Sequence, residues 1–414
     1  MDALTLRGGR VVTPDGVVDA DVVVERGRIA AVRRPGLVSQ DDSDPGRPGP
    51  SPGGSVDLQG RWVLPGFVDV HVHGGGGAQF NTADPDEVLR VARFHAQHGT
   101  TALLATTVAA PIEDLLVALG AIRTAAETPA ADAAELLGIH LEGPFLSRRW
   151  PGAMDPGHFL DPDPALLDRL LDGGRVRSIS LAPELPGACA LIERAADAGV
   201  LVSLAHSDAG YEDAAAAVRA GARAVTHAFN AMRPLHHRDP GMLGAALDLD
   251  ELTCEVICDG VHVAPAAVRL LQRLKGPART ALVTDAIEAT GLADGEYRLG
   301  DRRIAVADGR ATLPGAETIA GATLTMDRAL RNAVVFCDVS VADAARMAAT
   351  TPAELLGIAD RKGSVVPGLD ADLAILEPDL SLAGVMARGA WVRPLGAPAA
   401  AVQPPSSASR YGAR

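Results

Sequence analysis

The sequence has few aromatic residues, few cysteines and no long apolar run. Aromatics make up 3% of its 414 residues, so a core must be built from Ala, Val, Leu and Ile. The four cysteines form no Cys-x-x-Cys pair and no hydrophobic signal segment opens the chain, which indicates reduced thiols in a cytoplasmic protein. No stretch approaches the ~18 apolar residues that a membrane helix needs. A membrane protein is therefore not expected.

Basic runs are also absent. The chain has 52 acidic residues against 38 basic ones, which gives a net charge of −14. This balance argues against nucleic acid as a partner. An anionic substrate would need a local basic pocket, because the overall field repels it.

The order of predicted elements indicates an α/β fold. From Trp62 onward, apolar strand-like runs alternate with helical stretches that often end in glycine. Eight such strand–helix units are typical of a (β/α)₈ TIM-like barrel. A doubly wound open sheet is the alternative, but metal-suited residues on many different strands favour a closed barrel. The expected strands are 63–73, 101–107, 136–142, 176–182, 200–206, 223–229, 252–260 and 279–285.

Both chain ends contain further short strands. They predict a small β-sandwich domain made of residues 1–60 plus 360–395, which leaves 61–359 for the barrel. Residues 295–313 are expected to form an inserted hairpin. Residues 35–55 are expected to be a mobile loop and 396–414 a disordered tail, because their Pro, Gly, Ser and polar residues leave almost nothing to bury.

Five residues with metal-ligand chemistry lie at or near the ends of predicted strands: His71, His73, Glu142, His206 and His227. Side chains alternate along a strand, so the two imidazoles of His71 and His73 point the same way. In barrel enzymes the catalytic groups gather at the carboxyl ends of the strands, where Asp285 also falls. Imidazole and carboxylate together suit one or two divalent ions of Zn, Fe, Ni, Co or Mn. The sequence therefore predicts a metal-dependent hydrolase.

Several motifs follow one another in the order of a known family. His-Val-His73 follows Pro65-Gly-Phe-Val-Asp69, which resembles the opening motif of the amidohydrolase superfamily. Together with five later runs, the chain resembles one branch, the N-acetylglucosamine-6-phosphate deacetylases, over about residues 1–395. The five runs are His140-Leu-Glu-Gly-Pro-Phe145, Leu204-Ala-His-Ser207, His227-Ala-Phe-Asn-Ala-Met232, Cys258-Asp-Gly-Val-His262 and Val283-Thr-Asp-Ala286.

The resemblance implies a reaction and the residues that perform it. Glu142, His206 and His227 would hold the principal metal ion, and His71 and His73 a second ion that shares Glu142. Metal-activated water would hydrolyse the acetamide of N-acetyl-D-glucosamine 6-phosphate to D-glucosamine 6-phosphate and acetate. Asp285 would be the general base and then the general acid.

The resemblance also implies a phosphate pocket and a homodimer. The backbone of Asn230 and Ala231 would approach the phosphate, with Arg238 and His262 as charge partners. In the family such an arginine can come from a neighbouring subunit, so a homodimer is expected. The remaining expected substrate contacts are Ala153, Met154, Ile319, Ala320 and Gly321.

Met154 departs from the family pattern, which has histidine at this position to help polarise the substrate amide. A thioether cannot donate a hydrogen bond. Three explanations remain open: a second metal ion polarises the carbonyl, His158 fills the gap, or the substrate differs. Other readings are deacetylation of N-acetylgalactosamine 6-phosphate or another N-acyl amino-sugar phosphate, and a non-catalytic sugar-phosphate sensor. A dihydroorotase-like enzyme is disfavoured, because residues 175–182 contain no lysine to bridge two metals.

Overall fold

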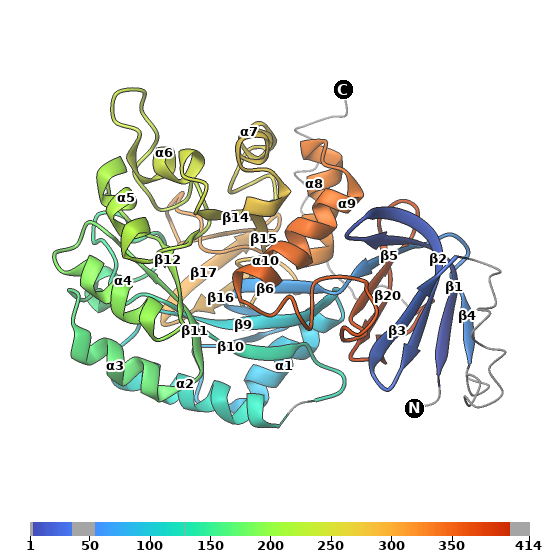
Figure 1. Cartoon of the computed structure of the whole chain (residues 1–414). Helices are drawn as coiled ribbons and strands as arrows, with labels where there is room; N and C mark the ends of the chain where they lie inside the picture. The colour runs from blue at the N-terminus through green and yellow to red at the C-terminus, as the bar shows by residue number, and fades with distance from the viewer. Residues whose placement is uncertain (1–2, 35–53, 129, 398–414) are drawn as a thin grey trace.

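A sheet of eight parallel strands forms the centre of the molecule. The computed structural model describes residues 3–34, 54–128 and 130–397. The sheet rolls up until its two ends meet, since the backbone N–H of Asp285 donates to the carbonyl of His71 at 2.9 Å. The predicted (β/α)₈ barrel is confirmed (Figure 1). Its strands are β6 (Phe67–Val72), β9 (Thr100–Val108), β10 (Glu135–Glu142), β11 (Val176–Leu181), β12 (Leu201–Leu204), β13 (Ala224–Val225), β14 (Thr253–Ile257) and β15 (Thr280–Val283).

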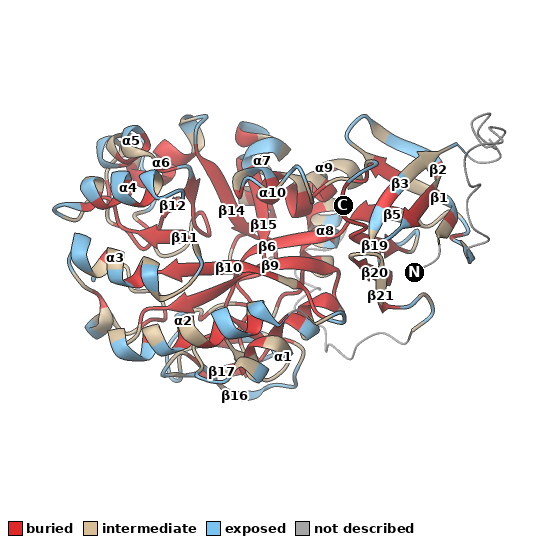
Figure 2. Cartoon of the chain, turned by 60° about the horizontal axis from the view of Figure 1, so that its bottom comes forward, coloured by how far each residue is buried: buried red, intermediate tan, exposed pale blue. Residues whose placement is uncertain are grey.

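Helices surround the barrel and bury one face each against it (Figure 2). Sequence signals set their ends: the Asp84 side chain accepts from the Asp86 N–H at the start of α1, and Pro85 occupies the first helical position. The helices are α1 (Pro85–Ala96), α2 (Ile112–Glu127), α3 (Pro164–Gly173), α4 (Ala188–Asp197), α5 (Tyr211–Ala220), α6 (Gly241–Asp248), α7 (Pro265–Lys275), α8 (Met326–Cys337), α9 (Val341–Ala345) and α10 (Thr351–Leu355).

The second sheet is built from both ends of the chain, as predicted, and lies to the right in Figure 1. Leu6, Val22 and Ile375 are among the residues of its buried core. Its strands, in spatial order, are β21 (Ala390–Arg393), β20 (Leu382–Ala387), β19 (Leu373–Leu376), β5 (Trp62–Pro65), β1 (Leu4–Thr13), β2 (Gly16–Glu25) and β3 (Arg28–Arg33), and β4 (Ser55–Asp57) also pairs with β1.

The predicted strand 63–73 is wrong as a single element. It divides at Gly66 into β5, which pairs with β1 and β19 of the small sheet, and β6 of the barrel. A Cβ at Gly66 would lie 2.4 Å from the side chain of Thr101, so only glycine fits where the chain passes between the two sheets. The boundary between the two sheets therefore falls at Gly66 rather than after residue 60.

The predicted insertion at 295–313 forms a three-stranded antiparallel sheet of β16 (Gly295–Leu299), β17 (Arg302–Ala307) and β18 (Arg310–Thr312). The side chain of Gln79, from the short pair β7 (Gly74–Gly75) and β8 (Ala78–Gln79), ties it to the barrel. Its amide oxygen accepts from the Gly300 N–H at 2.8 Å, and its amide nitrogen donates to the Gly300 carbonyl at 3.4 Å.

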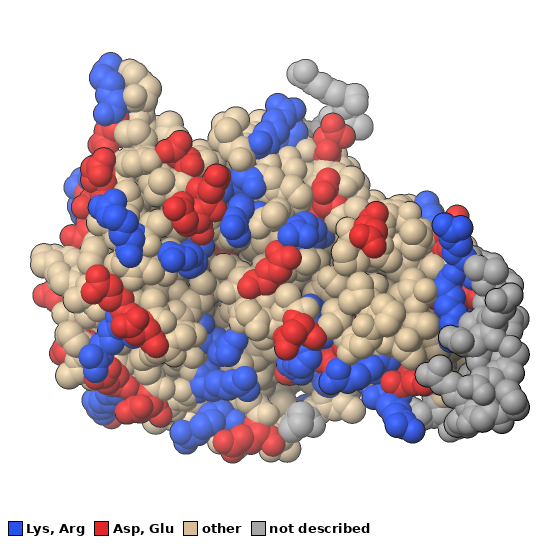
Figure 3. All heavy atoms as spheres, viewed as in Figure 1, with Lys and Arg blue, Asp and Glu red and all other residues tan. Residues whose placement is uncertain are grey.

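Most of the segments expected to be mobile or disordered, 35–55 and 396–414, lies outside the described residues. Of the first segment only 54 and 55 are described, and Ser55 begins β4. Among the described residues, no helix is long and apolar enough to cross a membrane. Acidic and basic side chains are interspersed over the face shown in Figure 3, without a continuous basic surface on that face.

A buried lysine joins the barrel to the small sheet. The Lys362 ammonium lies 2.6 Å from Asp372, which precedes β19, 2.9 Å from Glu135 at the start of β10, and 3.3 Å from Asp370. Burial alone would lower its pKa, but the charges of Asp372 and Glu135 raise the pKa of Lys362 above its ordinary value of 10.5. Lys362 is therefore a charged residue at the contact between the two sheets.

Replacing Lys362 with methionine is expected to lower the free energy of unfolding by about 3–5 kcal/mol, because it leaves the buried carboxylate of Asp372 without its cation. Denaturant unfolding at pH 7 measures this loss. Since the folded pKa is raised, the stabilisation is fully present below pH 10.5 and disappears as the pH rises through the folded value.

Arg361→Met is the matched control. Arg361 pairs with Glu135 at 2.6 Å and Asp370 at 3.3 Å, but its side chain is 38% exposed, so we expect a loss of about 1 kcal/mol or less. Equal losses for the two variants would contradict the special role of Lys362.

Candidate metal centre

The five predicted ligands meet at one end of the barrel. Glu142 ends β10, and one oxygen of its carboxylate, Oε1, lies 3.1 Å from His206 Nε2 and 3.0 Å from His227 Nε2. The other oxygen, Oε2, lies 3.4 Å from His73 Nε2, while Oε1 is 3.7 Å from His71 Nε2. Glu142 therefore contacts all four imidazoles.

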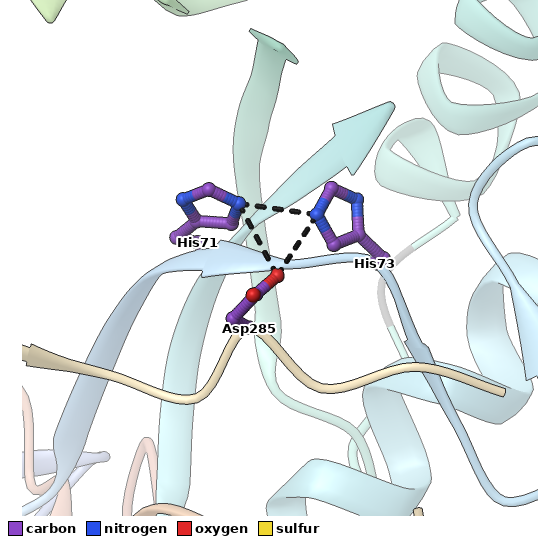
Figure 4. Close-up of side chains that lie close together, drawn as sticks. All are labelled: His71, His73 and Asp285. Carbon is purple, nitrogen blue, oxygen red and sulfur yellow. Dashed lines mark hydrogen bonds and ion pairs between the residues drawn. The ribbon is translucent and has the colours of Figure 1, made fainter. Parts of the chain in front are cut away.

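Asp285 follows β15 and completes the cluster. Its Oδ1 lies 3.1 Å from His73 Nε2 and 3.5 Å from His71 Nε2, and Figure 4 shows the three side chains pointing toward one another. The cluster thus contains two groups of three buried donors. One group is His71, His73 and Asp285, and the other is Glu142, His206 and His227.

Hydrogen bonds behind the histidines fix which nitrogen faces the cluster. His71 Nδ1 lies 3.0 Å from a carboxylate oxygen of Glu255, and His73 Nδ1 lies 3.3 Å from the carbonyl of Thr106. Both neighbours are acceptors, so both Nδ1 atoms carry the hydrogen and, in neutral imidazoles, both Nε2 atoms present lone pairs. These two lone-pair atoms lie only 3.1 Å apart, an arrangement that repels unless a cation lies between them.

His206 repeats this arrangement in the other group. Its Nδ1 donates to the carbonyl of Trp150 at 2.8 Å, which leaves its Nε2 lone pair facing Glu142 Oε1. Nitrogen and carboxylate oxygen donors that converge without hydrogens between them are the ligand set of Zn²⁺ and similar divalent ions. The residues present therefore fit a divalent metal.

The electrostatics of the cluster also favour positive charge. Burial alone would lower the pKa of His71, but Glu142, Glu255 and Asp285 raise it to about 10. Burial alone would raise the pKa of Asp285, but the hydrogen bond from His73 and the neighbouring imidazoles lower it to about 2. Asp285 is therefore ionised at neutral pH.

Backbone strain is concentrated at this end of the barrel. Left-handed φ angles are uncommon for residues other than glycine. Of the eleven such residues in the described chain, five follow the ends of barrel strands here, and three of these five belong to the ligand cluster. The five are His206 (φ 45°), His227 (30°), Phe229 (80°), Ala231 (48°) and Asp285 (48°).

A cavity of about 340 Å³ opens beside the cluster, and most of the predicted substrate contacts line it. They are Ala153, Met154, Asn230, Ala231, His262, Ile319 and Gly321. Ala320 is fully buried, with 0% exposure. Arg238 is exposed on the loop before α6, where its guanidinium lies 2.8 Å from His237 Nε2, and it does not reach the cavity of its own chain.

His262 lies in the cavity wall and pairs with a carboxylate. Its Nδ1 donates to a carboxylate oxygen of Asp259 at 2.7 Å, so Nε2 is the nitrogen left for a ligand. Burial opposes the charged form, but Asp259 raises the pKa of His262. The carboxylate that pairs with His262 thus lies in the same sequence run, Cys258–His262.

Met154 lies in an apolar wall of the cavity, packed in one cluster with Leu146, Phe159 and Ile287. His158 does not replace the missing imidazole. Its Nε2 lies 3.0 Å from Asp301 at the tip of the inserted hairpin, and it does not line the cavity. Of the three explanations for Met154, the one that depends on His158 is therefore not supported.

Two buried carboxylates next to the ligands were not predicted as site residues. Asp69 accepts from the Thr284 hydroxyl at 2.5 Å and from the His71 N–H at 3.2 Å, and burial raises its pKa to about 7. Glu255 accepts from His71, as described above. Each is the single acidic residue of a fully buried barrel strand, and this pattern was the sequence signal that could have identified them.

Four histidines and two carboxylates lie at the strand ends of this barrel, beside a cavity. This arrangement is typical of metal-dependent hydrolases. The family model for the Amidohydrolase family matches residues 62–392, and the chain belongs to this family. The relatives of the chain show to which branch of this family it belongs. The chain is 37% identical over 331 residues to the N-acetylglucosamine-6-phosphate deacetylase of Lysinibacillus sphaericus, which covers 79% of this chain and 84% of that protein. The predicted resemblance to this branch is confirmed.

Two further relatives support the same placement. The N-acetylgalactosamine-6-phosphate deacetylase of Escherichia coli O157:H7 is 33% identical over 387 residues, covering 93% of this chain and 98% of that protein. A solved variant of the Mycobacterium smegmatis N-acetyl-D-glucosamine-6-phosphate deacetylase, in complex with N-acetyl-D-glucosamine-6-phosphate, superposes with a TM-score of 0.87. It is 37% identical, and the match covers 95% of this chain and 100% of that chain.

Proposed function

We propose that this protein hydrolyses the acetamide of N-acetyl-D-glucosamine 6-phosphate to D-glucosamine 6-phosphate and acetate. The observation that carries the proposal is the convergence of six metal-suited donors, five of which line a cavity of about 340 Å³, in a chain of this family. No other part of the described chain joins buried metal donors to a cavity of this kind.

Glu142, His206 and His227 would hold the principal ion, and His71, His73 and Asp285 surround the position for a second. Their nitrogen and oxygen donors suit Zn, Fe, Ni, Co or Mn. When bound, a divalent ion lowers the pKa of its water from ~15.7 toward ~7 and so makes a nucleophile available at neutral pH.

Asp285 is the proposed proton carrier. Its carboxylate is ionised, because its pKa is lowered to about 2, and its Oδ1 is directed into the cluster. It can accept a proton from the attacking water and then deliver that proton to the departing amine.

The cavity wall would hold the sugar phosphate. Ala153, Met154, Ile319 and Gly321 would contact the sugar and its acetyl group, with Ala320 packed behind them. The backbone at Asn230 and Ala231, together with His262, would approach the polar groups of the substrate.

Arg238 is proposed to act in a partner subunit. A guanidinium can bind phosphate oxygens through two parallel hydrogen bonds. Because Arg238 is exposed and outside the cavity of its own chain, its use on the phosphate requires a homodimer. We propose such a dimer, in the cytoplasm.

The second candidate is the galactosamine epimer. It is favoured by Met154, which departs from the family pattern, and by the similarity to an N-acetylgalactosamine-6-phosphate deacetylase. Acetate release from both 6-phosphates and from unphosphorylated N-acetylglucosamine, with metal content read on the same sample, tests both proposals. Turnover of the glucosamine sugar phosphate alone is expected. Metal-loaded protein that turns over none of the three would reject the enzyme and favour a sugar-phosphate sensor.

Substituting histidine for Met154 is expected to change kcat by less than about tenfold, which is below the 10²–10³ that one missing donor costs in a site that depends on it. The substitution should also lower the free energy of unfolding by about 1–3 kcal/mol, because it places an imidazole in an apolar wall. Met154→Leu keeps the apolar volume and is the control. A gain of 10² or more in kcat for Met154→His would show instead that the missing donor limits this enzyme.

A further inference from the structure

Glu255 is a buried carboxylate that the reaction proposed above does not use. It lies in the middle of β14 and is 1% exposed. Its Oε2 accepts from His71 Nδ1 at 3.0 Å and lies 3.4 Å from the backbone N–H of His227. Its own carbonyl accepts from the Ala228 N–H at 2.8 Å. Glu255 therefore touches a ligand of each donor group, with its strongest contact on His71.

The other ligand histidines have weaker support. His73 and His206 each donate Nδ1–H to a neutral backbone carbonyl, at 3.3 and 2.8 Å. His227 Nδ1 has no hydrogen-bond partner among the described residues. Among these four histidines of the described chain, only His71 has a carboxylate at its Nδ1. Hydrogen bonds to an ionised acceptor are roughly twice as strong as neutral ones.

This contact decides what His71 presents to the cluster. With Nδ1–H held by Glu255, the Nε2 lone pair faces His73 Nε2 at 3.1 Å and Asp285 Oδ1 at 3.5 Å. In the other tautomer, Nε2–H would donate to Asp285 and place a hydrogen where an ion would bind. A carboxylate behind a ligand histidine both prevents this and makes the imidazole a better donor.

Charge balance leads to the same conclusion. Among the described residues, the ion pairs of Glu142, Asp285 and Glu255 are all made with histidines, and these are neutral when they ligate a metal. Uncompensated buried charge is costly. Two divalent ions carry more positive charge than Glu142 and Asp285 neutralise, and Glu255 lowers this excess by one charge. The third carboxylate therefore favours the second ion.

We propose that Glu255 is a positioning residue that fixes His71 and thereby allows the group of His71, His73 and Asp285 to hold a second divalent ion. This inference rests on the metal-dependent function proposed above. According to this proposal, Glu255 determines whether one or two ions bind, although Glu255 is not itself a ligand.

The test is metal binding by the full-length protein. Wild type, Glu255→Gln and Glu255→Leu are dialysed to equilibrium against buffered free Zn²⁺ over a range of concentrations, and zinc per chain is measured by mass spectrometry. Wild type should bind two ions. Leucine removes acceptor and charge, and should weaken the second ion by about 10–100-fold while the first stays bound. Glutamine removes only the charge and should give a smaller loss.

Cys254→Ala is the matched control, because Cys254 is the buried neighbour of Glu255 on β14 and contacts no ligand. It should bind two ions like wild type. Thermal melting of the metal-loaded proteins checks folding, and if the leucine variant does not fold, the near-isosteric glutamine variant decides.

Two results would overturn the proposal: a wild-type protein that binds one ion, or folded Glu255 variants that bind the second ion as tightly as wild type. Failure of the proposed function is a separate outcome. Two ions whose second site depends on Glu255, in a protein that releases no acetate from any of the three sugars, would reject the deacetylase and leave the positioning role intact.

Discussion

Asp285→Asn is expected to reduce kcat for acetate release by about 10²–10⁴-fold, which is the range that a general acid–base group contributes. The amide is nearly isosteric with the carboxylate but cannot accept the proton of the attacking water. KM should change much less than kcat, because the contacts of Asp285 Oδ1 are with the ligand histidines His71 and His73. Steady-state kinetics on N-acetylglucosamine 6-phosphate measures both constants.

Two readouts separate proton transfer from metal loss in this variant. Zinc per chain must be measured beside kcat, because Asp285 belongs to the second donor group. Asp301→Asn, on the exposed tip of the hairpin, controls for a change of one negative charge outside the metal-ligand cluster. A loss of less than tenfold in a fully metal-loaded Asp285→Asn protein would remove Asp285 from the proposed role.

Glu142→Ala should reduce both activity and metal content to the background of the assays. Its two carboxylate oxygens contact both donor groups, so alanine removes the residue that the two groups share. Excess Zn²⁺ should not rescue this variant. Wild-type protein stripped with a chelator has all six donors and should recover its activity when zinc, manganese or cobalt is returned.

His73→Ala provides the contrast. His73 contacts Asp285 and the second oxygen of Glu142, while His206 and His227 contact the first oxygen. We therefore expect His73→Ala to keep one ion per chain, where Glu142→Ala keeps none. If Glu142→Ala retained a tightly bound ion, the shared-carboxylate arrangement would be wrong.

The barrel and its rim could be predicted because the relevant patterns are local. Each barrel strand is a short run rich in apolar residues, and the predicted strands 101–107 and 136–142 lie within one residue of the observed limits of β9 and β10. The placement of the histidines and Asp285 needed only the rule that catalytic groups follow the carboxyl ends of barrel strands. The metal count and the role of Arg238 remain predictions.

What the sequence could not reveal depends on contacts between distant segments. Gly66 divides one apolar run into strands of two sheets because the side chain of Thr101 leaves no room for a Cβ. Glu255 was missed because its partner, His71, lies 184 residues earlier in the chain. No periodicity within either strand reveals that the two side chains meet inside the barrel.

The position of β5 has a consequence for synthesis. β5 lies between β1, which is made before it, and β19, which is made roughly 300 residues later. At about 5–20 residues per second, the ribosome needs roughly 15–60 s to complete that interval. Throughout this period the nascent chain has an unpaired strand edge, which is the kind of surface that pairs with other chains. Strand β19 closes that edge, so the solubility of the newly made protein depends on its last hundred residues as much as its first.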